Sequence, residues 1–149
     1  AGRRQGEPET GGAGDIVEDE TLHLLELSGL PYKAIMGNND THLIAHVEKF
    51  QLHQEPYYFT IDGLNVKLMH HPFYLVPDAD LIIYGHTHHF SVEYVGQTLF
   101  LNPGEVCARK KDLCECVLLD GNKSQWTLKH FTCKPEKRDW KIETKVFKS

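Results

Sequence analysis

Residues 81–90 read LIIYGHTHHF, an apolar run that ends in a segment with three histidines. Consecutive apolar residues are typical of a strand buried on both faces. Gly85 would let the backbone turn sharply out of that strand. Histidine here can be a metal ligand, a proton carrier, a core residue or surface decoration. As an i, i+2 pair, His86 and His88 could face two neighbouring metal ions at the end of the strand.

The overall composition is that of an ordinary globular chain. Its 149 residues suggest one domain, and a net charge of -5 argues against coating a nucleic acid in bulk. No apolar run approaches the roughly 18 residues of a membrane span, and the first residues do not read as a secretion segment. Four cysteines are too few for a disulfide framework. We therefore expect a cytoplasmic protein with reduced thiols and no membrane association.

The amino-terminal segment differs in composition from the rest. Residues 1–13, AGRRQGEPETGGA, contain no large apolar side chain, and glycine, proline and charged residues dominate. Such a composition predicts a disordered or non-native tail. Residues 14–149 are then expected to form a single domain.

Strand patterns dominate that domain. Asp62-Gly63 and Gly96-Gln97 each separate two apolar runs and predict hairpin turns. Short helices are predicted at 19–27 and 42–47, and the last 15 residues give no clear pattern. Strands are predicted at 32–36, 57–61, 64–69, 80–84, 91–95, 98–102, 113–120 and 126–131. This order indicates an α/β or α+β fold.

Four polar segments lie at predicted strand ends, where α/β proteins gather their sites. They are Gly14-Asp15, Gly37-Asn38-Asn39-Asp40, His70-His71 and Gly85-His86-Thr87-His88. Each alone is a weak signal, since turns and surface histidines are common, but their order and spacing together are specific. Imidazole suits zinc, manganese or iron, and carboxylate or amide oxygen suits harder ions such as manganese.

With Asn102-Pro103-Gly104 as a fifth segment, this order resembles the calcineurin-like metallophosphoesterases, and within them the small YfcE-type phosphodiesterase branch. The resemblance covers about residues 14–120. It implies an α/β fold in which a β-sandwich is flanked by helices (α/β/β/α). It also implies hydrolysis of a small phosphoester, most simply a phosphodiester, by metal-activated water. The implied cofactor is one or two divalent ions, Mn²⁺ first, with Zn²⁺, Fe²⁺ or Ni²⁺ as alternatives.

The resemblance also implies a metal-ligand set. Asp15 matches the carboxylate that bridges the two ions, and Asn38 matches the amide ligand of the second ion. His70 and His86 match the imidazoles on that second ion, while His88 matches the imidazole on the first.

Three further residues match positions near the reaction. Asp40 matches the acid that orients its neighbours. Asn39 stands where larger family members keep a catalytic histidine, and an amide cannot act as a general acid at neutral pH. His71 either lines the substrate cleft or is an exposed histidine, and His89 is expected to be surface.

One family motif has no counterpart. The family opens on Asp-x-His, and no histidine precedes Asp15 here. The sequence therefore predicts an amino-terminally incomplete fold, through a fragment, an altered start or completion by a partner chain such as a second copy. The first ion would lose two ligands, which predicts one well-bound metal and impaired activity.

Two alternatives to an active phosphoesterase remain open. A chain with half its metal shell could serve as a catalytically silent interaction scaffold of the same fold, like the retromer subunit. Separately, Cys114, Cys116, His130 and Cys133 could form a structural zinc site, since zinc accepts such ligands. Their spacing matches no familiar zinc module, and small buried thiols are common in cores.

Overall fold

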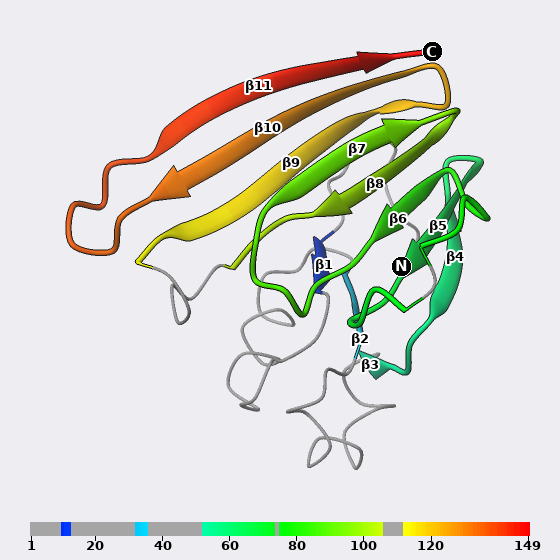
Figure 1. Ribbon diagram of the computed structural model, residues 1–149, viewed down its shortest axis with the longest axis horizontal. Coiled ribbons are helices and arrows are strands. Elements are labelled where there is room, and N and C mark those ends of the chain that lie inside the picture. The colour runs from blue at the N-terminus through cyan, green and yellow to red at the C-terminus, as the bar shows by residue number, and fades with distance from the viewer. Residues whose placement is uncertain (1–9, 13–31, 36–51, 74, 106–111) are drawn as a thin grey trace, which may run out of the picture.

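The computed structural model (Figure 1) describes residues 10–12, 32–35, 52–73, 75–105 and 112–149. In this part the strands form three sheets, with the orders β1-β2-β3, β4-β5-β6-β8-β7 and β11-β10-β9. The strands are β1 (Thr10–Gly12), β2 (Tyr32–Ile35), β3 (Leu52–His53), β4 (Tyr57–Ile61), β5 (Leu64–Leu68), β6 (Leu81–Ile83), β7 (Ser91–Val95), β8 (Thr98–Asn102), β9 (Cys114–Asn122), β10 (Gln125–Cys133) and β11 (Lys141–Lys148). None of the described residues forms a helix that is long and apolar enough to cross a membrane.

The smallest sheet is built from the amino-terminal part of the chain. Strand β2 confirms the strand predicted at 32–36, and it pairs in parallel with both β1 and β3. Strand β1 lies inside the segment 1–13, so residues 10–12 are ordered by pairing and depart from the predicted tail. Residues 1–9 and 13, and the helices predicted at 19–27 and 42–47, lie outside the described residues.

The central sheet places three strand ends on one edge. Strands β5, β6 and β8 run parallel to one another, while β4 and β7 flank them as antiparallel partners. The β4–β5 hairpin turns through Asp62 (φ 48°) and Gly63 (φ 81°), and positive φ at both positions matches the turn that Asp-Gly predicts. Because parallel strands end together, His70, His86 and Asn102 are delivered to the same edge.

The carboxyl-terminal sheet is antiparallel throughout and uses longer strands than the sequence predicts. Strands β9 and β10 include the predicted segments 113–120 and 126–131 almost entirely and extend past them. Strand β11 pairs with β10 along residues 141–148, where no strand was predicted. Its charged residues at 141, 143, 145 and 148 obscure the apolar alternation of Ile142 and Val146.

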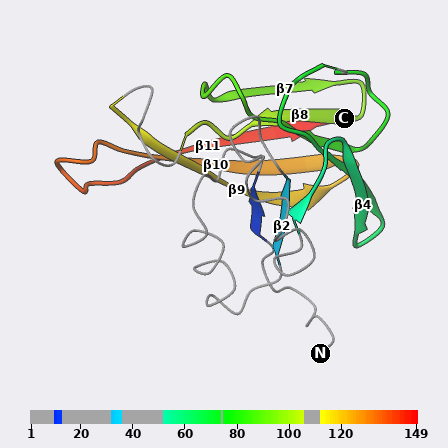
Figure 2. The same ribbon diagram turned by 90° about the horizontal axis from the view of Figure 1, so that it is seen from below.

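A buried cluster joins the central and carboxyl-terminal sheets into a sandwich, which Figure 2 shows from the side. Val66, Leu81 and Leu99 of the central sheet pack with Trp126 of β10, and all four are almost completely buried. Burying such side chains contributes about 1.5–3 kcal/mol each. The sandwich therefore holds β5, β6 and β8 firmly, and their ends form a rigid platform for the polar residues that follow.

Candidate metal centre

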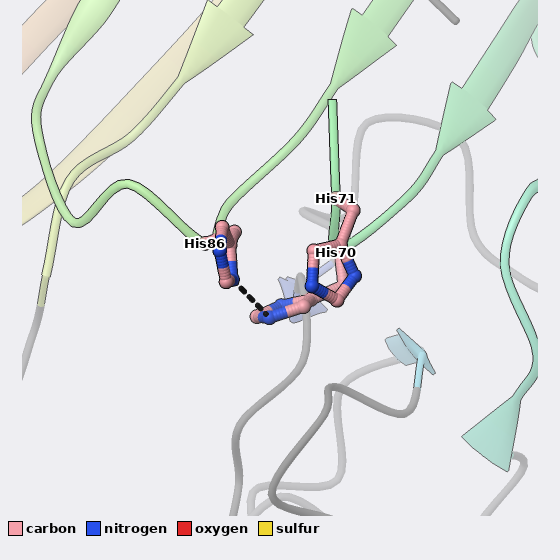
Figure 3. A group of neighbouring side chains, drawn as sticks. All are labelled: His70, His71 and His86. Atoms are coloured by element: carbon pink, nitrogen blue, oxygen red, sulfur yellow. Dashed lines mark hydrogen bonds between the residues drawn. The ribbon is translucent and has the colours of Figure 1, made fainter. Parts of the chain in front are cut away.

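Three histidines meet where β5 and β6 end (Figure 3). His70 and His71 follow β5 and His86 follows β6, and these two strands are hydrogen-bonded neighbours. Nε2 of His70 lies 3.2 Å from Nδ1 of His86. One possible ligand atom from each of the three rings lies within 4.8 Å of the other two. His70 is buried, His71 is half-buried and His86 is exposed, so the cluster opens from the core to the solvent.

The spacing of the imidazole nitrogens suits a common metal ion. Nitrogens 3.2 Å apart, each about 2.0–2.1 Å from one ion, subtend an angle of about 100° at that ion. This angle lies between the octahedral and tetrahedral values. Imidazole is a ligand for zinc, iron and nickel, so His70 and His86 fit a divalent ion without selecting one metal, and a ligand atom of His71 lies within 4.8 Å of both.

The loop that carries His86 is held in a strained conformation. His86 (φ 64°) and His88 (φ 61°) both occupy the left-handed region, whereas Gly85 is not among the described residues with positive φ. The predicted turn at Gly85 therefore falls on the histidines instead, at a cost of about 1–3 kcal/mol per residue. Strain of this kind collects at functional sites, where the surrounding structure enforces it.

Asn102 at the end of β8 holds the loop in this conformation. Its side-chain nitrogen donates to the carbonyl of Gly85 at 3.2 Å and to Oγ1 of Thr87 at 2.8 Å. Thr87 also accepts a hydrogen bond from the backbone N–H of His89. Asn102 is fully buried and Thr87 is exposed, so these bonds tie the exposed loop to a fixed side chain. The Asn-Pro-Gly segment thus fixes the histidine loop of the neighbouring strand.

Glu55 is a supporting residue that sequence reasoning missed. Its Oε2 accepts hydrogen bonds from the backbone N–H groups of His70 and His71, and its Oε1 lies 3.1 Å from Nδ1 of His71. A carboxylate that receives Nδ1–H leaves Nε2 of the ring as the lone-pair donor for an ion. Glu55 belongs to no motif, so only the folded structure brings it to the histidines.

We expect Glu55→Gln to weaken Mn²⁺ binding about 10–100-fold, the usual cost of losing an outer carboxylate partner. The amide retains the shape but loses the negative charge that orients His71. Calorimetric titration of metal-freed protein measures the change. Glu136→Gln, at an exposed glutamate, is the matched control. Equal affinities in both variants would show that Glu55 does not support the centre.

His88 points to a different partner. Its Nδ1 lies 3.1 Å from Oε1 of the buried Glu105. Among the described residues, the clustered imidazoles are those of His70, His71 and His86, without His88. Its predicted role on a first ion stays a prediction. His89 is exposed, as expected.

The structure thus brings together only part of the predicted site. His70 and His86 meet as predicted, and His71, expected in the substrate cleft or on the surface, joins them. The remaining predicted site residues, Asp15, Asn38, Asn39 and Asp40, lie outside the described residues.

The alternative zinc site around Cys116 is wrong. His130 uses Nε2 to contact Oε2 of Glu115 at 2.7 Å inside the sandwich. Cys116 pairs across the sheet with Phe131, the neighbour of His130, and neighbours along a strand face opposite sides. Imidazole and thiol therefore point away from each other. Desolvation also raises the pKa of the Cys116 thiol, which opposes the thiolate that zinc requires.

Known proteins resemble this chain in sequence family and in fold. A family described as "Calcineurin-like phosphoesterase superfamily domain" matches residues 11–124. A Vps29 single mutant from Entamoeba histolytica superimposes with a TM-score of 0.74 and 23% identity, over 96% of this chain and 84% of that one. Wild-type Vps29 from the same organism, complexed with Zn²⁺, gives 0.71 and 21% over 95% and 84%.

An archaeal phosphodiesterase gives a TM-score of 0.64 and 22% identity over 92% of this chain and 83% of that one. No curated protein sequence matches the chain. At these identities the structural likeness shows the fold, and it confirms the predicted α/β class and its β-sandwich.

Proposed function

We propose that this chain, which belongs to the calcineurin-like phosphoesterase superfamily, is a metal-dependent phosphoesterase and specifically a phosphodiesterase. The observation that carries the proposal is the meeting of His70, His71 and His86 at the ends of two parallel strands. A divalent ion at these rings would polarise the phosphoryl oxygens of the substrate and lower the pKa of a water molecule.

Some residues would bind the ion and others would orient its ligands. His70, His71 and His86 would bind the ion through nitrogen atoms, and Asp15 and Asn38 are proposed to complete its coordination shell with oxygen atoms. The oxygen donors suit Mn²⁺, which we propose as the first candidate, and the imidazoles suit Zn²⁺, Fe²⁺ and Ni²⁺ as alternatives. Glu55 orients His71, and Asp40 is proposed to orient Asn38 and Asn39.

An aromatic side chain beside the cluster supports a substrate with a flat apolar group. The ring of Phe73 stacks on that of His71 with centroids 4.8 Å apart, and Phe73 remains 70% exposed. A large exposed aromatic at a polar site is available to contact a ligand. Asn39 cannot protonate a leaving group, so a group of low pKa, such as an aryl alcohol, suits the site.

A catalytically silent interaction scaffold is the second candidate, because the similar structures include Vps29 proteins as well as a phosphodiesterase. Two observations favour the enzyme. The left-handed conformations of His86 and His88 cost stability. Both carboxylate oxygens of Glu55 contact the pair His70-His71. A scaffold has no evident use for either feature.

Removal and return of the metal separates the two candidates. We expect the chelated protein to hydrolyse no aryl phosphodiester, to bind Mn²⁺ in a calorimetric titration, and to regain hydrolysis with the bound ion. Hydrolysis that survives chelation would come from a contaminant or a metal-free mechanism. A protein that binds one of these ions but hydrolyses nothing, or that binds no Mn²⁺, Zn²⁺, Fe²⁺ or Ni²⁺, would be a scaffold.

A further inference from the structure

We propose that β11 is the contact of a symmetric dimer, in which the β11 strands of two copies pair antiparallel about a two-fold axis at Thr144. The carboxyl-terminal sheets of both copies then continue into each other. This contact goes beyond the proposed hydrolytic function and uses none of the residues of the metal centre.

Strand β11 offers an open edge for such pairing. In the order β11-β10-β9 it bonds to β10 on one side, and no described strand bonds to its other side. Figure 1 shows β11 along the margin of the molecule, ending at the carboxyl terminus. The strand spans Lys141–Lys148, so it exposes a long row of backbone donors and acceptors. Such a row is a template for another strand.

The register with β10 fixes which side chains of β11 face outward. Trp126 and Leu128 of β10 are buried in the sandwich, and the residues opposite them are Phe147 and Lys145. Residues 143, 145 and 147 of β11 therefore share the inner face, while 142, 144 and 146 share the outer face. The outer face carries Ile142 (59% exposed) and Val146 (51% exposed), two apolar side chains open to solvent.

Symmetry restricts how two such strands can pair. A two-fold axis perpendicular to the sheet sets each outer residue of one strand opposite an outer residue of the other. The axis must therefore pass between two copies of the same residue, which is the centre of the pairing. A centre at Thr144 sets Ile142 against Val146 and Glu143 against Lys145, each twice. Opposite charges and apolar groups facing each other directly are favourable cross-strand pairs.

The neighbouring centres are disfavoured by charge. Centring on Lys145 places that lysine against its own copy, and centring on Glu143 does the same with the glutamate. Like charges directly opposite are destabilising. Lys145 also lies with Nζ 5.3 Å from the centroid of the Phe90 ring, which fixes it on the inner face. Pairing at Thr144 uses the edge of both copies, so the assembly closes at two.

Charge exchange tests the pairing. Light scattering and sedimentation equilibrium are expected to give twice the mass of one chain for the unaltered protein. Glu143→Lys, at an exposed position, places lysine against lysine twice, and we expect the dissociation constant to rise about tenfold or more. The double variant Glu143→Lys/Lys145→Glu restores opposite charges and is expected to restore the dimer. A monomeric unaltered protein, or a dimer insensitive to Glu143→Lys, overturns the proposal.

A cysteine pair tests the register directly, and it does so without altering charge. In a Cys116→Ala background, Thr144→Cys lies on the axis, and opposed Cα atoms about 4.5–5.5 Å apart are within disulfide range. We expect this variant to form a covalent dimer on mild oxidation, and peptide mapping should find the disulfide between the two introduced thiols. Ile142→Cys places its thiols several residues apart and is expected to remain uncrosslinked. Crosslinking of Ile142→Cys, or none of Thr144→Cys, would exclude the Thr144 register.

Discussion

The His86→Ala variant is expected to lose more than about 100-fold of metal-dependent hydrolysis of an aryl phosphodiester. This loss exceeds the 10–100-fold change that is typical when an outer partner of a ligand is removed, because the proposed role of His86 is to supply a ligand atom itself. Its Nδ1 lies 3.2 Å from Nε2 of the buried His70, so one ion can join both rings. Mn²⁺ affinity, measured calorimetrically on metal-freed protein, should fall together with the rate.

Two control variants separate ligand loss from a change in the loop. His86 has φ 64°, a conformation that glycine adopts without strain, so His86→Gly removes the imidazole without adding backbone strain or another ligand atom. It should lose activity as His86→Ala does. His89→Ala alters an exposed histidine of the same loop and should retain full activity. Activity preserved in His86→Gly would exclude His86 as a ligand, and equal loss in His89→Ala would indicate a general collapse of the loop.

The sequence predicted the described strands of the sandwich well where pattern and turn chemistry agreed. The run that becomes β6 is apolar throughout and the run that becomes β5 alternates apolar and polar residues, while Asp62-Gly63 strongly favours a tight hairpin turn. Strand β11 escaped prediction because lysine and glutamate alternate with Ile142 and Val146, so its composition is that of an exposed segment. An edge strand buries too little to require a stronger pattern.

The candidate metal centre was predictable only where residues match a family motif. His70 and His86 follow predicted strands, and the resemblance to the calcineurin-like metallophosphoesterases predicted that both bind metal. Glu55 and Glu105 could not be identified, because each contacts its histidine across at least 15 residues of chain and no local pattern records such a contact. The placement of the turn on His86 rather than Gly85 depends on the hydrogen bonds of Asn102, which are equally non-local.

The stability of the sandwich is expected to depend most on Trp126. The side chain is 3% exposed and packs against Val66, Leu81 and Leu99 of the opposite sheet. Gly121 lies opposite it in β9, and a Cβ there would stand 3.0 Å from Cε3 of the indole, so the ring has no free space beside it. Trp126→Ala would leave a cavity between the sheets, and we expect it to cost about 3–5 kcal/mol of unfolding free energy.

Trp126→Phe is the matched control, and urea unfolding followed by circular dichroism measures both variants. Nε1 of Trp126 is buried and has no hydrogen-bond partner among the described residues. Phenylalanine keeps most of the aromatic volume and removes that N–H, so Trp126→Phe should lower the unfolding free energy by less than about 1.5 kcal/mol. Because the strands that carry His70 and His86 belong to the packed sheet, Trp126→Phe should also retain Mn²⁺ binding. A loss below about 1 kcal/mol in Trp126→Ala would mean that the two sheets do not depend on this contact.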